Sequence, residues 1–402
     1  MRPSRSSVSR TTLQMVSSTA ACVVRSRTAS VARWSRRRTT SCVAAVSELF
    51  TTVDGVCIAV NCTKFIAPHM KRPVTDRTEL KHNTRMSNDR SPLKTEQPMR
   101  IALSGSSGLL GSALSVCLTN HGHTVIPIVR ASEVPASKAP QISMHPARGI
   151  VPSQLEGIDA VIHLAGAGIA DQRWSAARKR EILESRVRGT RFVAEAMATA
   201  QHECSRPPRL LLSASAVGYY GATSRVVDET SGAGLGFLAD VVQQWEDASR
   251  SARDAGIRVV HLRFGVILAK QGGALGAMLR PFRLGLGGPL GNGQQGFPWV
   301  SRDDAMEVIR FCLNDASIEG AVNVVAPAHT TQREFARSLG KALRRPAFLP
   351  MPAWVVGLLF GEMGRTLLLE GAFVAPSVLT QHGFQFKDAS LSDALRTILK
   401  QA

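Results

Sequence analysis

Residues 100–111 read RIALSGSSGLLG, and this short stretch decides the fold. Its apolar start is brief and stops at Gly105, which predicts a buried parallel strand. A helix is predicted from Leu109 to Asn120, because Gly122 follows as a stop signal. A glycine-rich turn between a strand and a helix is the sequence context of a dinucleotide-binding loop.

The three glycines of this turn each have a separate physical role. Gly105 would make the tight turn, Gly108 would let the backbone approach a pyrophosphate, and Gly111 would let the helix pack on the strand. Free N–H groups and the positive end of the helix dipole would then hold the phosphates. We therefore expect a dinucleotide site, and the alternative is a glycine-rich turn in an α/β protein that binds no cofactor.

Strands and helices are predicted to alternate beyond this turn. The expected strands are 124–129, 159–164, 209–212 and 258–262, and the expected helices are 174–200 and 237–255. Such alternation gives βαβ units, so the predicted fold class is a Rossmann-type, doubly wound parallel sheet over residues 99–264. Residues 265–402 are expected to form a smaller α+β domain on the substrate side. Helices are expected there at 302–314, at 331–343 and, buried or packed, at 354–369.

The first 98 residues differ from the rest in composition. They hold 17 Lys and Arg against 6 Asp and Glu, which is more than half of the net charge of +19. Residues 1–47 contain nine Arg, many Ser and no acidic residue, a composition typical of an organellar transit peptide. We expect a disordered basic extension that directs import, with the mitochondrion as the destination. The alternatives are a plastid, or a cytoplasmic protein whose translation starts at Met99.

The composition argues against several functional classes. Aromatic residues make up 5% of the chain and the basic excess lies mainly in the extension, so no nucleic-acid partner is expected. No run reaches the roughly 18 apolar residues of a membrane span. The seven cysteines form no C-x-x-C pair and no cluster with zinc spacing, so no metal site is expected. A small-molecule substrate remains, which the sequence does not name.

The end of the second predicted strand bears on the choice of cofactor. An acidic residue there would bond the ribose 2′-hydroxyl of NAD, but the chain has Val129-Arg130 and no acid before Glu133. A guanidinium makes a charge-assisted fork to a phosphate, so Arg130 favours NADP(H). The alternative for Arg130 is a solvated loop arginine. The small residues up to Gly166, after the strand that ends near His163, would leave room for ribose and nicotinamide.

Ordered motifs along residues 99–402 resemble the extended short-chain dehydrogenase/reductases, and more closely their atypical branch called epimerase family proteins. The motifs are Gly105-x-x-Gly108-x-x-Gly111, His163-Leu-Ala-Gly, Arg173-Trp174, Glu181, Ser185-Arg186-Val187, Tyr219-Tyr220, Trp245-Glu246, the glycine-rich stretch from Pro281, Pro298-Trp299-Val300 with Asp303-Asp304, Leu368-Leu-Glu-Gly371 and Gly383-Phe-x-Phe386.

This resemblance implies a set of cofactor contacts. It adds Arg130, Leu164, Ala165, Gly166, Glu181 and Arg186 to the loop residues Gly105, Ser106, Ser107, Gly108, Leu109, Leu110 and Gly111.

The sequence departs from this family at the proton-transfer pair. Ordinary members carry Tyr-x-x-x-Lys on the helix after the fifth strand, but no Tyr or Lys lies between Gly221 and Arg263. Ser215, Tyr219 and Tyr220 are then the candidates for acid–base chemistry, with Tyr220 preferred. A tyrosine needs a nearby cation to act as an acid near neutral pH, and Arg186 or Arg263 would serve. The alternative is that both tyrosines only pack.

The residues Trp299, Ser301 and Asp303, around the start of the predicted helix at 302–314, allow two interpretations. Trp299 could hold a substrate, whereas Asp303 or Ser301 is suited to cap that helix.

Two function classes follow for the whole chain. The first is an NADP(H)-dependent oxidoreductase or epimerase-like enzyme, and the second is a non-catalytic NADP(H)-binding redox sensor or assembly factor. The missing pair favours the second, and the retained C-terminal domain favours the first.

Overall fold

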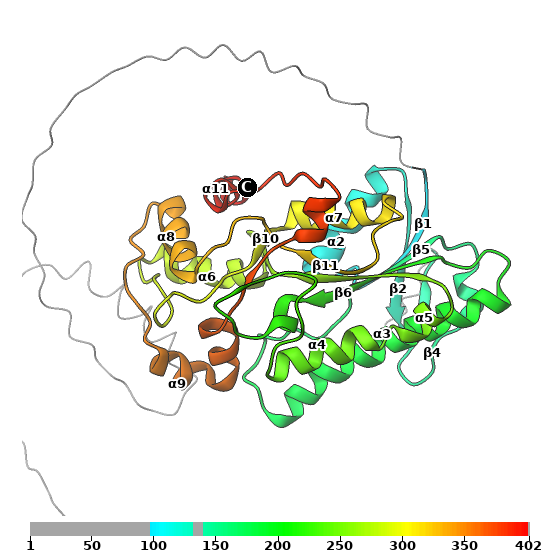
Figure 1. The fold of residues 1–402 in the computed structure, drawn as a ribbon, viewed down its shortest axis with the longest axis horizontal. Helices are drawn as coiled ribbons and strands as arrows, with labels where there is room; N and C mark the ends of the chain where they lie inside the picture. Colours follow the sequence, from blue (N-terminus) through cyan, green and yellow to red (C-terminus); the bar gives the residue numbers. More distant parts are fainter. Residues whose placement is uncertain (1–96, 132–139, 401–402) are drawn as a thin grey trace, which may run out of the picture. The chain divides into compact units, whose positions relative to one another are not determined.

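A mixed sheet of eight strands forms the centre of the computed structural model, which describes residues 97–131 and 140–400 (Figure 1). The strand order is β11-β8-β6-β5-β1-β2-β3-β4, and every pairing is parallel except that of β3 with β4. The strands are β1 (Arg100–Ser104), β2 (Thr124–Arg130), β3 (Ile142–His145), β4 (Gly149–Ile150), β5 (Ala160–His163), β6 (Leu210–Ala216), β8 (Arg258–Phe264) and β11 (Gly320–Val324). This order confirms the doubly wound α/β fold. Successive strands are added on one side of β1 up to β4 and on the other side from β5 to β11, so the strand order reverses between β1 and β5.

Helices cover both faces of the sheet because its central strands are apolar on both sides. Ile101 and Leu103 face one side, where they join a core that includes α2 (Leu109–Asn120) and α7 (Arg302–Asn314). Ala102 faces the other side and packs in the core of the long helix α3 (Ala176–Glu203). The alternation of neighbouring residues between two cores is the pattern of a strand buried on both faces.

The predicted helix at 237–255 is two helices, α4 (Phe237–Asp247) and α5 (Arg250–Asp254). The break lies at Ser249, which is fully buried and whose hydroxyl donates to the Glu246 carbonyl oxygen at 2.7 Å. A side-chain hydroxyl that bonds a nearby carbonyl competes with the helical ladder, and the ladder is interrupted here.

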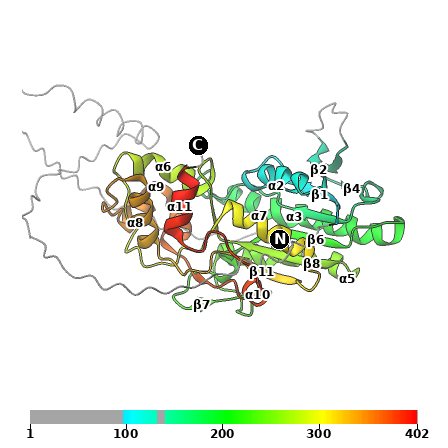
Figure 2. The same cartoon turned by 90° about the horizontal axis from the view of Figure 1, so that it is seen from above.

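The remaining elements are interspersed with the sheet strands or follow them. They are η2 (Pro152–Leu155), η3 (Val217–Tyr220), β7 (Val226–Val227), β9 (Val266–Leu268), α6 (Gly273–Arg283), β10 (Trp299–Ser301), α8 (Gln332–Leu343), α9 (Ala353–Gly364), η4 (Arg365–Leu369), β12 (Phe373–Val374), α10 (Ser377–Gln381) and α11 (Leu391–Lys400). Of these, α6, α8, α9 and α11 lie together at one end of the described part of the chain (Figure 2). Apolar side chains of α6, α8 and α11 make a separate core around Phe335 and Trp299.

The sheet extends past the residue at which the sequence ended the cofactor domain. β11 pairs with β8, with Val322 opposite Leu262, and α7 packs beside α2. The predicted boundary between residues 264 and 265 thus divides the strands of one sheet, because β11, which comes after the boundary, pairs with β8 at the edge of the sheet. The prediction for residues 1–98 falls, apart from residues 97 and 98, outside the described residues.

The helix predicted at 354–369, expected to be buried or packed, buries only a small part of its surface. Trp354 is 66% exposed and Leu358 is 57% exposed, and of the side chains on α9 only Val356 and Met363 are buried. The helix is apolar on every side, so the sequence gives no face to tell core from surface. Gly361, with φ of +62°, interrupts it before the π-helical turn η4. No helix within the described ranges has the length and apolarity to cross a membrane.

Candidate functional site

The glycine loop lies at the carboxyl end of β1, where the strand order reverses. Gly105 has φ of +72°, and Gly108 N donates to the Gly105 oxygen at 3.0 Å to close the turn. A Cβ at Gly111 would lie 2.1 Å from that oxygen, so the helix approaches the turn as closely as only glycine allows. Gly108 is the N-cap of α2, and no side chain caps the helix. The first N–H groups of α2 thus stay available for an anion.

The carboxyl end of β5 meets the glycine loop through its backbone. A Cβ at Gly105 would lie 2.9 Å from Ala165 N, so Leu164 and Ala165 lie directly against the turn. The Ser104 hydroxyl accepts from Leu164 N at 3.2 Å and from Ala165 N at 3.4 Å, and it bonds His163 Nδ1 at 2.7 Å. Burial lowers the pKa of His163 to about 4, which keeps the imidazole neutral near pH 7. His163 therefore aligns two strand ends and is not a base.

The segment after β5 is braced by α3 and its approach. The Trp174 indole donates to the Ile169 oxygen at 2.8 Å, and Ala167 N donates to the Ser185 hydroxyl at 3.2 Å. The buried Arg178 guanidinium donates to the Gly168 oxygen and to Glu181 Oε2, the latter at 2.7 Å. Glu181 thus fixes Arg178, and through it the loop. No motif in the sequence indicated this role for Arg178.

Arg186 lies beneath the same loop. A Cβ at Gly166 would be 3.6 Å from Arg186 Cγ, and the Arg186 guanidinium lies 5.1 Å from the centre of the Trp245 ring. Burial lowers the pKa of Arg186 to about 10, helped by the neighbouring charge of Arg178. Arg186 remains a cation at neutral pH, and its side chain lies against Gly166 in the segment that follows β5.

Arg130 is the last residue of β2 and is exposed. Because Ile128 pairs with Ser104, Arg130 extends past the same edge of the sheet as the glycine loop. Residues 132–139, including Glu133, lie outside the described residues. Of the loop side chains, Ser107 is exposed, and Leu109 lies beneath the backbone of Gly272 and Gly273.

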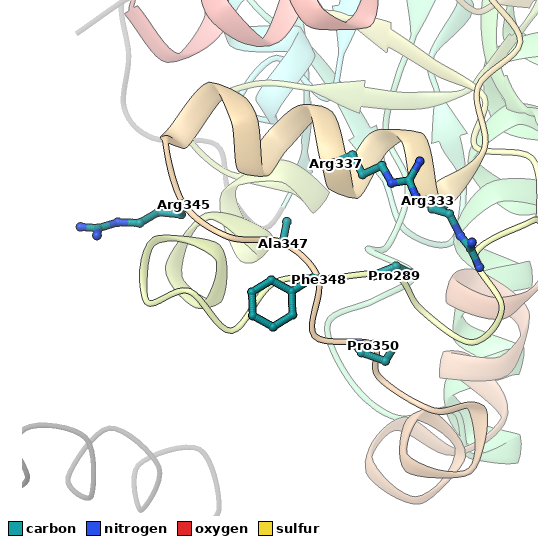
Figure 3. Close-up of a pocket in the computed structure, with 7 residues that line it drawn as sticks. All are labelled: Pro289, Arg333, Arg337, Arg345, Ala347, Phe348 and Pro350. Atoms are coloured by element: carbon teal, nitrogen blue, oxygen red, sulfur yellow. The ribbon is translucent and has the colours of Figure 1, made fainter. Parts of the chain in front are cut away.

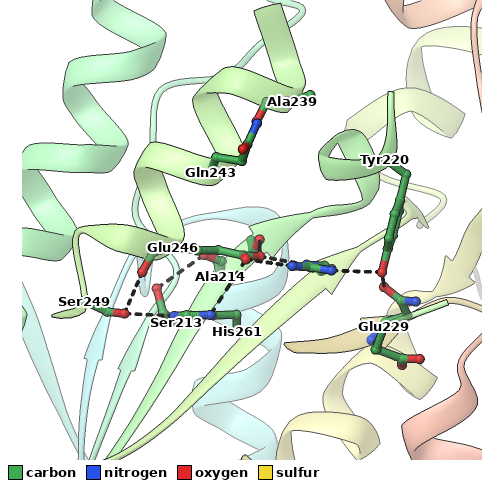
Figure 4. Close-up of polar contacts among 12 residues, drawn as sticks. Ser213, Ala214, Tyr220, Glu229, Ala239, Gln243, Glu246, Ser249 and His261 are labelled. Atoms are coloured by element: carbon green, nitrogen blue, oxygen red, sulfur yellow. Dashed lines mark hydrogen bonds and ion pairs between the residues drawn. The ribbon is translucent and has the colours of Figure 1, made fainter. Parts of the chain in front are cut away.

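The structure brings Ser215, Tyr219 and Tyr220 together at the end of β6, around Arg263 of β8. Figure 4 shows the polar contacts around Glu246, with Tyr220 on one side and Ser249 and His261 on the other. The Ser215 hydroxyl donates to Glu246 Oε1 at 2.6 Å. Arg263 forms two bonds of 2.8 Å to the same carboxylate, so the pair is bidentate. Burial raises the pKa of Glu246, but Arg263 outweighs it and holds the pKa below its ordinary value.

Tyr220 is buried with its hydroxyl fully engaged. It accepts from Arg263 Nη1 at 3.0 Å and donates to Asn323 Oδ1 at 2.8 Å. Burial raises its pKa in spite of these partners, which makes Tyr220 a weak proton donor. The Tyr219 ring stacks on Arg263, with the guanidinium carbon 3.5 Å from the ring centre. Among the described residues, none forms a hydrogen bond to the Tyr219 hydroxyl.

The network continues into the C-terminal part of the chain. Asn323 of β11 donates through its amide to the Ala375 oxygen at 2.9 Å. The Glu229 carboxylate accepts from Asn323 N at 2.9 Å and from Ser377 N at 3.1 Å. Buried polar groups of this kind hold one arrangement when all are satisfied. The candidate proton donors are thus fixed by contacts from β8, β11 and α10.

The start of α4 carries apolar residues. A Cβ at Gly218 would lie 3.3 Å from Leu238 Cβ, and Val241 and Val242 are buried. Phe237 packs edge-on against Trp174 at 5.0 Å, with the Lys179 ammonium 4.9 Å from its ring centre. None of these α4 side chains can donate a proton.

Trp299 is buried in the C-terminal core, and Ser301 rather than Asp303 caps α7. Trp299 is 1% exposed, and its indole donates to the Thr330 hydroxyl at 3.1 Å. Ser301 is the N-cap of α7 and accepts from Asp304 N at 3.1 Å, as the capping interpretation predicts. Asp303 lies in the first turn of that helix and is exposed on its side chain by 43%.

Two protein-family models match this chain. The family described as NAD dependent epimerase/dehydratase matches residues 101–325, and a domain of unknown function, DUF1731, matches residues 351–398. The chain belongs to the NAD dependent epimerase/dehydratase family. Within it, an epimerase family protein of Mycobacterium bovis is 41% identical over 297 residues, which cover 73% of this chain and 96% of that protein.

Two eukaryotic relatives are similar over the same part. The epimerase family protein SDR39U1 of Homo sapiens is 35% identical over 305 residues, covering 75% of this chain and all of that protein. A crystal structure of human SDR39U1 with NADPH has a TM-score of 0.67 and 34% identity, and it covers 76% of this chain and 100% of that chain. An Arabidopsis thaliana homologue described as chloroplastic is 38% identical and covers 76% of this chain and 88% of that protein. The family resemblance predicted from the sequence is confirmed.

Sequence reasoning found some members of the network and missed others. Trp245-Glu246 stood out only as a family motif, and Arg263 only as a possible cation for a tyrosine. Asn323 and Glu229 carried no signal, because each contacts a partner far away in the sequence. The family motif Trp245-Glu246 was the signal in the sequence that marked Glu246.

Proposed function

We propose that the chain is an NADP(H)-dependent oxidoreductase or epimerase-like enzyme. One observation carries the proposal, namely that Gly105 closes against Leu164–Ala165 at the reversal point of the sheet. Cofactors of this fold bind at that crevice. The NADPH of the human SDR39U1 structure supports the choice of cofactor. The loop residues would hold the pyrophosphate, and the bound cofactor would supply the hydride. The direct test is calorimetric titration of NADPH and NADH into the full-length protein.

Arg130→Ala is expected to remove the preference for NADPH over NADH. The guanidinium would pair with the 2′-phosphate, which NADH lacks, and a charged hydrogen bond contributes about 1.5–3 kcal/mol. NADPH affinity should therefore fall about 10- to 150-fold, while NADH affinity stays nearly constant. Titration of both cofactors into both proteins measures this. Equal losses for the two cofactors would show that Arg130 does not bind the 2′-phosphate.

We assign proton transfer to the group Ser215, Tyr219 and Tyr220, and within it to Tyr219. Ser215 and Tyr220 already donate to Glu246 and Asn323. The Tyr219 hydroxyl is uncommitted among the described residues, and the Arg263 guanidinium stacks on its ring, 3.5 Å from the ring centre. Reduction of a carbonyl needs a proton within about 3 Å of the oxygen, from a group at this end of the sheet.

Tyr219→Phe is expected to lower turnover at least about 100-fold with unchanged NADPH affinity, the lower range for loss of a general acid. Ser215→Ala and Tyr220→Phe should act mainly on stability, because their hydroxyls serve the buried network. The assay is NADPH consumption with a substrate found by screening. Parent-like turnover of Tyr219→Phe would place the proton donor elsewhere.

A second candidate function is a non-catalytic NADP(H)-binding sensor or assembly factor. It is favoured by the apolar residues Leu238 and Val242 on the helix that ordinarily carries the proton-transfer pair. A thermal-shift screen of metabolites with NADPH present separates the two. A metabolite that stabilises the protein only with NADPH supports the enzyme, and no response across substrate classes supports the sensor.

We propose that residues 1–98 direct import into an organelle, with the mitochondrion as the destination. The nine Arg and absent acids of residues 1–47 support this, and the chloroplastic Arabidopsis relative keeps the plastid as the second possibility. A fluorescent protein fused to residues 1–98 is expected to enter the organelle. A cytosolic fusion, or translation shown to begin at Met99, would contradict the proposal.

A further inference from the structure

The outer face of α8 carries a line of cations. Arg333, Arg337 and Lys341 follow one another at intervals of four residues on the helix, and Arg344 comes directly after its C-terminal end. The opposite face is buried, with Phe335 and other side chains in the C-terminal core. The acidic residue Glu334 lies in the first turn, where its carboxylate accepts from Thr331 N in a capping box at 2.8 Å. We call the four cations the α8 stripe, and it presents net positive charge to solvent.

Exposed apolar side chains lie beside the α8 stripe. The loops 284–290 and 346–351 run together, since Met351 N donates to the Pro289 oxygen at 2.9 Å and Gly285 lies against Pro346. These loops and α9 carry six large apolar side chains that are at least 44% exposed: Leu284, Leu286, Phe348, Leu349, Trp354 and Leu358. Phe348, at 77%, follows the end of the stripe by four residues. We call these six side chains the apolar rim.

A hollow of about 470 Å³ lies between the stripe and the rim, lined by Pro289, Arg333, Arg337, Arg345, Ala347, Phe348 and Pro350. Figure 3 shows the Arg345 guanidinium pointing to the opposite side from those of Arg333 and Arg337. Three guanidiniums that diverge cannot enclose one small anion. They are suited instead to many anionic groups spread over a plane.

We propose that this surface docks on an anionic lipid bilayer, with Phe348 and Leu349 between the headgroups and the α8 stripe over their phosphates. Aromatic and leucine side chains flanked by Lys and Arg are the composition of interfacial membrane binding. Charge complementarity decides for this occupant, because residues 280–291 contain no acid and residues 332–361 contain only Glu334. A neutral apolar partner would leave the stripe unpaired. Docking of this kind needs no membrane span.

The test uses the full-length protein and vesicle flotation, since residues 1–47 also hold nine Arg and must be present in every sample. Vesicles of phosphatidylcholine alone are compared with vesicles that contain phosphatidylglycerol. We expect binding only to the anionic vesicles, and weaker binding as salt rises. Phe348→Asp with Leu349→Asp should reduce it at least about tenfold. Arg337→Gln with Lys341→Gln should do the same, since each cation near the surface contributes about fivefold.

Matched controls lie on other faces. Arg180→Gln with Arg191→Gln removes two exposed cations of α3, and Val116→Asp places a charge at an exposed apolar position of α2. Both should bind vesicles like the parent. Parent-like binding by the Phe348/Leu349 variant overturns the proposal and assigns vesicle binding to another segment. Concentration-dependent dimerisation that this variant abolishes, without vesicle binding by the parent, overturns it in favour of a second copy of the chain.

Discussion

Gly111→Ala is expected to weaken NADPH binding at least about 100-fold while the protein stays folded. The added Cβ would lie 2.1 Å from the Gly105 oxygen and 2.8 Å from the Gly105 carbonyl carbon. Both are backbone atoms, so the turn itself must move to admit the methyl group. Breaking two hydrogen bonds to the phosphates, at about 1.5 kcal/mol each, corresponds to a change of this size. Calorimetric titration of NADPH measures it, and the thermal midpoint reports whether the fold persists.

Gly232→Ala is the matched control, because a Cβ at Gly232 would meet no atom within 4 Å. It should bind NADPH like the parent. If Gly111→Ala binds equally well, then the phosphates do not lie on the turn before α2, and the proposed cofactor site is wrong.

Glu246→Gln is expected to destabilise the protein by about 3–5 kcal/mol, the cost of leaving a buried charge without its partner. The Arg263 side chain is 5% exposed and would keep only neutral acceptors in place of the carboxylate. The free energy of unfolding from denaturant titration measures the loss. Asp247→Asn on the same helix breaks an ion pair with Arg250 in which both side chains are more than half exposed. That control should leave the free energy of unfolding nearly unchanged, because water screens an exposed pair.

The pH dependence gives a second readout for Glu246. Its pKa in the folded protein lies below the ordinary value, so its contribution to stability is present above about pH 4.3 and is lost as pH falls through the folded pKa. The stability gap between the parent and Glu246→Gln should therefore shrink below about pH 4. A gap that stays constant down to pH 3 would show that the carboxylate charge is not what stabilises Arg263.

The glycine loop and the doubly wound sheet were predictable because their signals are local. Gly105, Gly108 and Gly111 lie within seven residues, and each of the five predicted strands contains a short apolar run; β3, β4 and β11 were not predicted. The helix break at Ser249 was not predictable, since the apolar pattern continues through it and only a side-chain hydrogen bond ends the helix. The exposure of α9 was missed because a helix apolar on all sides gives no orientation.

The polar network around Arg263 could be predicted only in fragments. Its bonds join residues 17, 43 and 103 positions apart, and no spacing rule reaches over such distances. Ser215, Tyr219 and Tyr220 were found because they follow a predicted strand of the sheet. Their partners were hidden because Glu246, Asn323 and Glu229 belong to elements whose position depends on the completed fold. The family pattern marked Glu246 without explaining it.

The Glu229 carboxylate also sets an order of events during synthesis. One of its oxygens accepts from Asn323 N and the other from Ser377 N, 148 residues further along the chain. A ribosome that has released the chain as far as β8 has delivered the glycine loop, both tyrosines, Glu246 and Arg263. The surroundings of Tyr220 are complete only after Ser377 has emerged. The glycine loop is therefore made early in translation, whereas the contacts that surround Tyr220 are completed only near its end.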